Sequence, residues 1–161
     1  MSKSHFAAAG ALVIALGVAG AAQAASPLSP LAGTWSGGGT LTTSDGMQER
    51  LRCRATYDVE GNGAAVSLNL RCASASYNFD LAGNAAYRGG TITGSWSEAT
   101  RNASGTISGQ ASGDRIEAAA RGDSFSANLS LTTRGDRQTV SIRPQAANVT
   151  AVSLSLSRSG R

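Results

Sequence analysis

Beyond its first 24 residues, the sequence contains no histidine and no lysine. His5 is its one histidine and Lys3 its one lysine, so each remaining basic side chain is an arginine. Cysteine and proline are scarce, with two and three residues, and aromatic residues make up 5% of the chain. Without histidine, and with only two thiols, the usual ligands of zinc and other transition metals are missing. We therefore expect no metal or other cofactor.

Long apolar runs are absent except near the N-terminus, where residues 6–20 are rich in Ala, Leu and Val. Lys3 precedes this run, and Ala22-Gln23-Ala24 follows it with the small-x-small pattern of a cleavage site. Residues 1–24 are therefore predicted to be a signal peptide, with the mature chain beginning at Ala25. The alternative is an uncleaved membrane anchor, although a spanning helix needs about 20 apolar residues.

The mature chain is predicted to be one exported domain with a short arm before it. Residues 25–32 contain Pro27 and Pro30, and we expect them to form an exposed arm. Residues 33–161 are long enough for a single domain with a sizeable core. Thirteen arginines face ten carboxylates, a small excess that differs from the concentrated basic surface of a nucleic-acid-binding protein. We expect a periplasmic monomer with no membrane span after cleavage and no nucleic-acid partner.

The two cysteines, Cys53 and Cys72, lie at equal distances in sequence on either side of Asn62-Gly63. Asn-Gly between two alternating segments is a strong signal for a two-residue hairpin, because both turn residues need a positive φ. The thiols would then face each other at a hydrogen-bonded rung, with Cα atoms about 5.5 Å apart, and form a disulfide. This bond would stabilise the fold by roughly 3 kcal/mol and indicates an oxidising compartment. The alternatives are two free thiols or an intermolecular bridge.

Apolar residues alternate with polar ones along most of residues 33–161, and Gly, Asn and Asp separate the alternating runs. In the predicted hairpin, the apolar positions of residues 51–59 pair with those of residues 66–72. Further strands are expected near residues 91–98, 103–110, 114–120, 125–132, 137–143 and 152–157. The predicted fold class is all-β, a single antiparallel β-barrel or barrel-like sandwich of roughly eight to ten strands with one disulfide-linked hairpin.

The first strand opens with Gly33-Thr34-Trp35, which resembles the Gly-x-Trp opening of calycin-type barrels. These include lipocalins, avidin-like proteins and the small bacterial metalloprotease inhibitors. In lipocalins an arginine from the final strand packs over that tryptophan, and here Arg158 follows the last predicted strand in inward phase. The resemblance therefore implies a calycin-like barrel with Arg158 over Trp35. Residues 33–39 also look like the glycine-rich opening of nitrobindin-type haem barrels, but those ligate iron through histidine.

A small ligand inside the predicted barrel is one candidate partner. Trp35 and Trp96 each share a strand phase with neighbouring glycines, and small residues beside large aromatic ones can leave a hollow. Glu98 and Arg158 would be its polar anchors, so the candidate ligand-binding residues are Trp35, Trp96, Glu98 and Arg158. The alternative is that the glycines serve strand bending and coiling, and that Trp35 only plugs one end of the barrel.

An anion on the outer face of the hairpin is a second candidate partner. Arg50, Arg52, Arg54 and Arg71 share the outward phase there, and Arg54 falls directly opposite Arg71. Like charges in such a pair repel each other. An acidic neighbour such as Glu117 would relieve the repulsion, and so would a bound anion held by bidentate arginine contacts.

Catalysis is not expected from this sequence. No histidine or lysine remains in the mature chain to activate a nucleophile, and no pair of carboxylates lies in an apolar context that would raise a pKa. The predicted function is that of a secreted, non-catalytic binding protein for a small molecule or an anionic envelope component. The alternatives are a protein-interaction module, such as a periplasmic protease inhibitor acting through residues 25–32, or a purely structural envelope protein.

Overall fold

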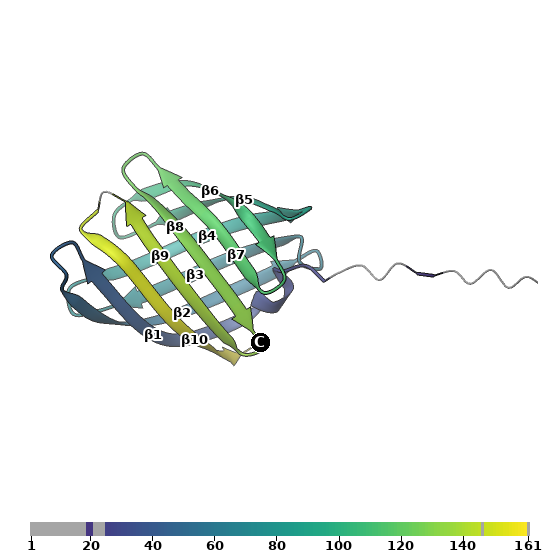
Figure 1. Ribbon diagram of the computed structural model, residues 1–161, viewed down its shortest axis with the longest axis horizontal. Helices are drawn as coiled ribbons and strands as arrows, with labels where there is room; N and C mark the ends of the chain where they lie inside the picture. The colour runs from purple at the N-terminus through teal and green to yellow at the C-terminus, as the bar shows by residue number, and fades with distance from the viewer. Residues whose placement is uncertain (1–18, 21–24, 146, 161) are drawn as a thin grey trace, which may run out of the picture.

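The computed structural model describes residues 19–20, 25–145 and 147–160, so the predicted signal peptide lies almost entirely outside the described residues. Ten antiparallel strands form one closed barrel (Figure 1). The strands are β1 (Gly33–Thr43), β2 (Gln48–Glu60), β3 (Ala65–Ala73), β4 (Asn78–Arg88), β5 (Thr91–Glu98), β6 (Ala103–Ser112), β7 (Arg115–Gly122), β8 (Ser126–Arg134), β9 (Arg137–Gln145) and β10 (Val149–Gly160). Each strand pairs with its neighbours in sequence, and β1 pairs with β10 to close the sheet. The predicted all-β barrel is confirmed.

Alternation of apolar and polar residues explains which side chains face inward. In β10, Val152, Leu154 and Leu156 are buried, and the serines between them are exposed. Because side chains in a strand point alternately to the two faces, this pattern directs one set to the barrel interior and the other to the outer surface. β2, β3, β5 and β6 show the same alternation. No helix in the described ranges is long and apolar enough to span a membrane.

The cysteine hairpin has the predicted register and a different turn. Cys53 faces Cys72 across β2 and β3, and the disulfide is present. The last strand pair is Glu60 with Ala65, so the turn contains four residues instead of the predicted two. This change in turn length makes the two cysteines a non-hydrogen-bonded pair, where a hydrogen-bonded pair was predicted. Their Cα atoms are 4.1 Å apart, near the ~4.5 Å of a non-hydrogen-bonded pair and below the ~5.5 Å expected for a hydrogen-bonded one.

The segment before β1 is packed against the barrel, which differs from the predicted exposed arm. Leu28 and Leu31 are 1% and 2% exposed, and a short 3₁₀ helix, η1 (Ser29–Leu31), carries the second of them. The hydroxyl of Ser26 donates to the carbonyl of Gly63 in the β2–β3 turn at 2.6 Å. Two leucines spaced three residues apart place their side chains on one side of a 3₁₀ turn. The segment therefore plugs one end of the barrel, called here the η1 end.

Several inward glycines allow neighbouring strands to approach closely. A Cβ atom on Gly39 of β1 would lie 1.7 Å from the carbonyl oxygen of Ser153 on β10. A Cβ on Gly105 of β6 would lie 1.9 Å from the carbonyl oxygen of Arg121 on β7. Any other residue would clash with backbone at these positions. This finding supports the interpretation that these glycines serve the tight coiling of the sheet.

Candidate functional site

Arg158 and Trp35 meet at the η1 end of the barrel. The guanidinium carbon of Arg158 lies 4.2 Å from the centroid of the Trp35 ring. The same guanidinium donates to the carbonyl of Pro30 at 2.8 Å and to that of Ala32, and its Nε pairs with Asp136 at 2.9 Å. The arginine-over-tryptophan contact that the calycin resemblance implied is therefore present. It ties the last strand to the segment before the first strand.

A buried polar chain lies beside this end. The hydroxyl of Tyr57 on β2 donates to Oε1 of Gln138 on β9 at 3.0 Å, and Nε2 of Gln138 donates to Oγ1 of Thr133 at 3.2 Å. Gln138 is 1% exposed. Burial raises the pKa of Tyr57, so the phenol keeps its proton and remains a donor. Because the three side chains bond to one another, the η1 end is filled and its polar groups are already partnered.

The opposite wall of the barrel is less tightly filled. Most inward apolar side chains of β10, β1 and β2 are buried, whereas those of β3 to β9 are mixed. Val66, Ile92 and Trp96 are buried there, and other inward side chains keep part of their area exposed. The partly exposed set is Leu68, Leu70, Ala85, Tyr87, Ile107, Ile116, Leu131, Val140 and Ile142. In a closed barrel, an inward side chain keeps exposed area only where other side chains do not fill the space beside it. We call the interior space along β3 to β9 the lumen.

Trp96 is an inward residue of β5 and carries an unpartnered donor. The residue is 6% exposed, and its indole Nε1 is buried without any hydrogen-bond acceptor. Its ring packs edge-on against Phe125, with centroids 5.6 Å apart, and over the backbone of Gly122. A buried N–H group without a partner costs about 1–3 kcal/mol. This orphaned donor therefore marks a place where a bound group with an acceptor atom would be stabilised.

Gly83 on β4 provides space beside that donor. It pairs with Trp96 across β4 and β5 and with Leu68 across β3 and β4. A Cβ added to Gly83 would meet only the carbonyl of Ser95 at 3.6 Å and Cδ1 of Ile107 at 3.9 Å, which are ordinary contacts. In this respect Gly83 differs from the glycines that touch neighbouring backbone. Sequence reasoning missed it, because its phase alone does not separate an open glycine from a crowded one.

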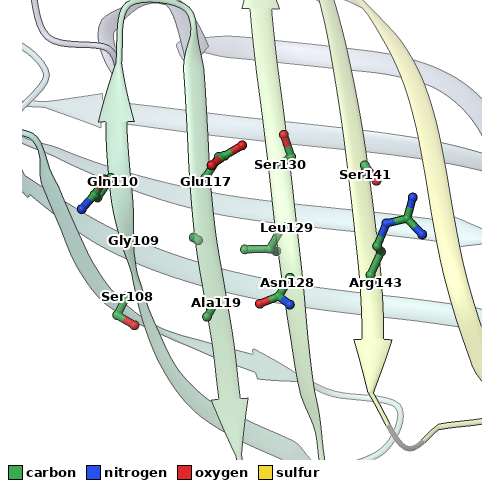
Figure 2. A pocket seen from close by; sticks show the side chains of 11 residues that line it. Ser108, Gly109, Gln110, Glu117, Ala119, Asn128, Leu129, Ser130, Ser141 and Arg143 are labelled. Atoms are coloured by element: carbon green, nitrogen blue, oxygen red, sulfur yellow. The ribbon is translucent and has the colours of Figure 1, made fainter.

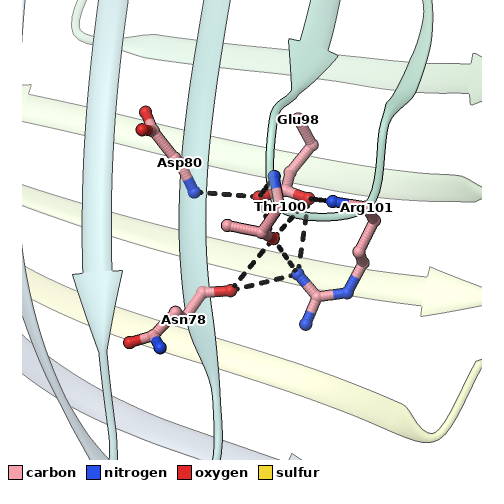
Figure 3. Close-up of polar contacts among 5 residues, drawn as sticks. All are labelled: Asn78, Asp80, Glu98, Thr100 and Arg101. Atoms are coloured by element: carbon pink, nitrogen blue, oxygen red, sulfur yellow. Dashed lines mark hydrogen bonds and ion pairs between the residues drawn. The ribbon is translucent and has the colours of Figure 1, made fainter.

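Glu98 lies one inward position beyond Trp96, but its carboxylate is engaged in the β5–β6 turn. It accepts hydrogen bonds from the backbone N–H of Asp80 at 2.9 Å and of Arg101 at 3.0 Å, and from the Thr100 hydroxyl at 2.6 Å (Figure 3). Burial would raise the pKa of Glu98, but these hydrogen bonds outweigh burial and hold it below its ordinary value. Figure 3 shows Asn78 beneath the same cluster, accepting a bond from Arg101 through its carbonyl. This geometry favours a structural role for Glu98.

The structure divides the four predicted ligand-binding residues into two pairs. Trp35 and Arg158 lie on the adjacent strands β1 and β10, whereas Trp96 and Glu98 lie on β5, on the opposite side of the ring of strands. The polar groups of Trp35 and Arg158 already have partners within the protein. Trp96 is the member whose side chain retains a buried polar group without a hydrogen-bond acceptor.

The predicted arginine face is present on the outer surface. Arg54 lies opposite Arg71, as predicted, and Arg71 lies opposite Asp80, whose carboxylate is 3.5 Å from its Nε. The acidic neighbour is therefore Asp80, not Glu117. Glu117 pairs with Arg115 on β7, at 2.5 Å.

A shallow polar hollow of about 460 Å³ also lies on the outer surface, across β6 to β9. Figure 2 shows Gln110, Glu117, Asn128 and Arg143 around the small side chain of Ala119. Ala119 lies between Ser108 and Asn128 of the neighbouring strands. The hollow is separated from the lumen by the sheet itself, so it is a second, independent place where a ligand can be tested.

Comparisons with known proteins place the fold. No protein-family model and no curated protein matches the sequence. Among solved structures, Rv2717c from M. tuberculosis is 14% identical, with a TM-score of 0.65 over 81% of this chain and 94% of that chain. The S-type phycobiliprotein lyase CPES from Guillardia theta is 9% identical, with a TM-score of 0.58 over 80% of this chain and 88% of that chain. The fold is calycin-like.

One of these matches corrects an expectation from the sequence. We expected no catalysis, because the mature chain lacks histidine and lysine and both cysteines are bonded. A protein with this fold is nevertheless a lyase by name. The expectation that the chain is not an enzyme is therefore overturned, and residue composition alone does not set the limits of what this barrel can do.

Proposed function

We propose that this protein binds a small, mainly apolar ligand in the lumen, with an acceptor atom of the ligand bonded to Nε1 of Trp96. The single observation that carries the proposal is the buried indole N–H without a partner. It belongs to an inward residue among strands whose inward side chains in part keep exposed area. An apolar cavity with few polar groups is the ordinary chemistry of a small-molecule site. A barrel of ten strands is also wide enough for an internal ligand.

The fold comparison is consistent with this proposal, since a phycobiliprotein lyase shares the barrel. Our proposal also places the protein in the periplasm, and the Cys53–Cys72 disulfide supports an oxidising compartment. The competing role as a protease inhibitor has lost its basis, because residues 25–32 were expected to be a free arm and instead contribute Leu28 and Leu31 to the core. A purely structural envelope protein is the outcome if no ligand binds.

The test uses cis-parinaric acid, a fluorescent apolar chain that ends in a carboxylate, and N-phenyl-1-naphthylamine, an apolar probe without a carboxylate. W96F removes the indole N–H and keeps an aromatic ring. We expect W96F to weaken binding of parinaric acid by about tenfold, equal to one hydrogen bond of ~1.4 kcal/mol. Binding of the second probe should change much less. Equal losses for both probes would contradict the assigned acceptor.

The location of the ligand is tested by filling space on either side of the sheet. G83L places a side chain in the lumen beside Trp96, whereas A119F fills the outer hollow of Figure 2. We expect G83L to abolish binding and A119F to leave it unchanged. The reverse result would move the site to the outer hollow. G83A serves as a milder variant if G83L fails to fold, and binding of neither probe by the wild type would refute the proposal.

A further inference from the structure

Three arginines on β2 form a separate feature on the outside of the barrel. Arg50, Arg52 and Arg54 occupy alternate, outward positions and are exposed. We call this set the arginine column. Alternate residues of a strand lie about 6.8 Å apart, so the three guanidinium groups project from the surface in a row. The column lies outside the sheet and is independent of the lumen proposed above.

The charge of the column is not neutralised by the protein. Within the described part of the chain, none of its three side chains has a hydrogen bond or ion pair with another residue. The nearby carboxylates either already have partners of their own or lie too far from the column. Asp80 pairs with Arg71, and Glu49 accepts hydrogen bonds from Ser74 and Ser76. Asp58 is on the same face of β2 but four residues from Arg54, about 13 Å along the strand.

The surface beside the column is rich in hydroxyl groups. In the sheet, Arg50, Arg52 and Arg54 face Thr40, Gly38 and Ser36 of β1, which in turn face Ser153, Ser155 and Ser157 of β10. Gly38 cannot carry a side chain, because a Cβ there would lie 2.4 Å from the carbonyl oxygen of Leu51. Serine and threonine hydroxyls both donate and accept hydrogen bonds, as sugar hydroxyls do.

We propose that the arginine column and the hydroxyl-lined strands beside it bind an acidic polysaccharide. Guanidinium groups form bidentate hydrogen bonds with carboxylate or sulfate groups. A polymer that repeats such groups engages several arginines at once, and each added contact gains from the ones already made. Serine and threonine side chains of β1 and β10 supply hydrogen bonds to the uncharged parts of the sugar rings.

Two other polyanions fit the surface less well. A membrane would need apolar residues that insert beside the basic ones, and Met47 is the one large apolar side chain exposed among the described residues, at 64%. Single-stranded nucleic acid is held by aromatic side chains on which its bases stack, and the outward positions of β1, β2 and β10 are not aromatic. Both polymers are included as alternatives in the test.

The experiment measures binding of polygalacturonate to the full mature chain by isothermal titration calorimetry at ~20 mM and ~150 mM salt. The test variant is R50Q/R52Q/R54Q. The matched control, R88Q/R121Q/R143Q, removes the same charge from exposed arginines of β4, β7 and β9. We expect the test variant to weaken binding about tenfold or more, with a smaller dependence of affinity on salt. The control should bind within about twofold of the wild type.

Several outcomes would overturn the proposal. Equal losses in the test and control variants would show a response to net charge alone. Stronger binding to anionic phospholipid vesicles or to single-stranded DNA than to polygalacturonate would assign the column to a different polymer. Absence of polygalacturonate binding at ~20 mM salt would remove the site altogether. Equal binding of uncharged dextran would show that the arginines are not needed.

Discussion

The guanidinium of Arg158 covers the indole of Trp35, and the two residues close the barrel at its η1 end from opposite termini of the chain. Trp35 donates its own N–H to the carbonyl of Leu31 at 2.7 Å. Arg158 donates to carbonyls of the same preceding segment, at Pro30 and Ala32. The planar, positively charged guanidinium of Arg158 therefore holds η1 against the end of the barrel, and the indole of Trp35 packs beneath it.

Replacing Arg158 by lysine should destabilise the protein by about 1–3 kcal/mol, because lysine keeps the charge but loses the planar fork and several charge-assisted hydrogen bonds. Urea unfolding at neutral pH measures the change. R134K is the matched control. Arg134 pairs with Asp114 on the exposed surface, and such pairs contribute at most about 1 kcal/mol. Equal effects of the two substitutions would show that the carbonyl contacts of Arg158 are unimportant.

Two glycine substitutions should differ although both residues face inward. G105A should destabilise the barrel by about 1–3 kcal/mol, because its Cβ would overlap the backbone of β7 and force the strands apart. G83A should be neutral or stabilising by up to about 1 kcal/mol, since its Cβ has room and the unfolded chain loses freedom. Thermal unfolding of the two variants provides the comparison. Similar losses for both would show that the space beside Gly83 is filled.

The stability contributed by Glu98 should depend on pH. Its hydrogen bonds lower the pKa of the carboxyl in the folded state, so its contribution is present above the pKa of the unfolded chain and is lost as pH falls through the lower, folded value. E98Q should destabilise the protein by about 1–3 kcal/mol at pH 7. The difference from the wild type should shrink below about pH 4. Urea unfolding at several pH values checks this, and a constant difference would contradict it.

The sequence predicted the hairpin register correctly because the alternation of apolar residues and the positions of the two cysteines indicate the same pairing. Apolar residues of β2 and β3 face one another only if Cys53 meets Cys72, and a slip by one residue would expose one face of the core. β4, by contrast, was not predicted as a strand. Its Asn, Asp, Gly and Ala residues have weak β propensity, and it pairs with β3 and β5 on its two sides. Tertiary pairing, not local preference, makes this segment a strand.

The candidate site was only partly predictable for a related reason. Strand phase identified Trp35 and Trp96 as inward residues, but it could not show that one indole N–H has an acceptor and the other has none. That difference depends on where Leu31 lies, and residues 25–32, which include it, were expected to be an exposed arm because of Pro27 and Pro30. Likewise, the sequence does not show that Gly83 has space for a side chain and that Gly105 has none. This difference depends on how closely the backbone of the neighbouring strand approaches each glycine.

Pairing of β1 with β10 makes closure of the barrel depend on two strands that lie far apart in the sequence. The other strand pairings join neighbours in sequence, and such hairpins can form early because little chain must be ordered to make them. Until β10 is in place, β1 and β9 each keep one unpaired edge, which another chain could extend. Removing β10 would therefore leave an open, aggregation-prone sheet.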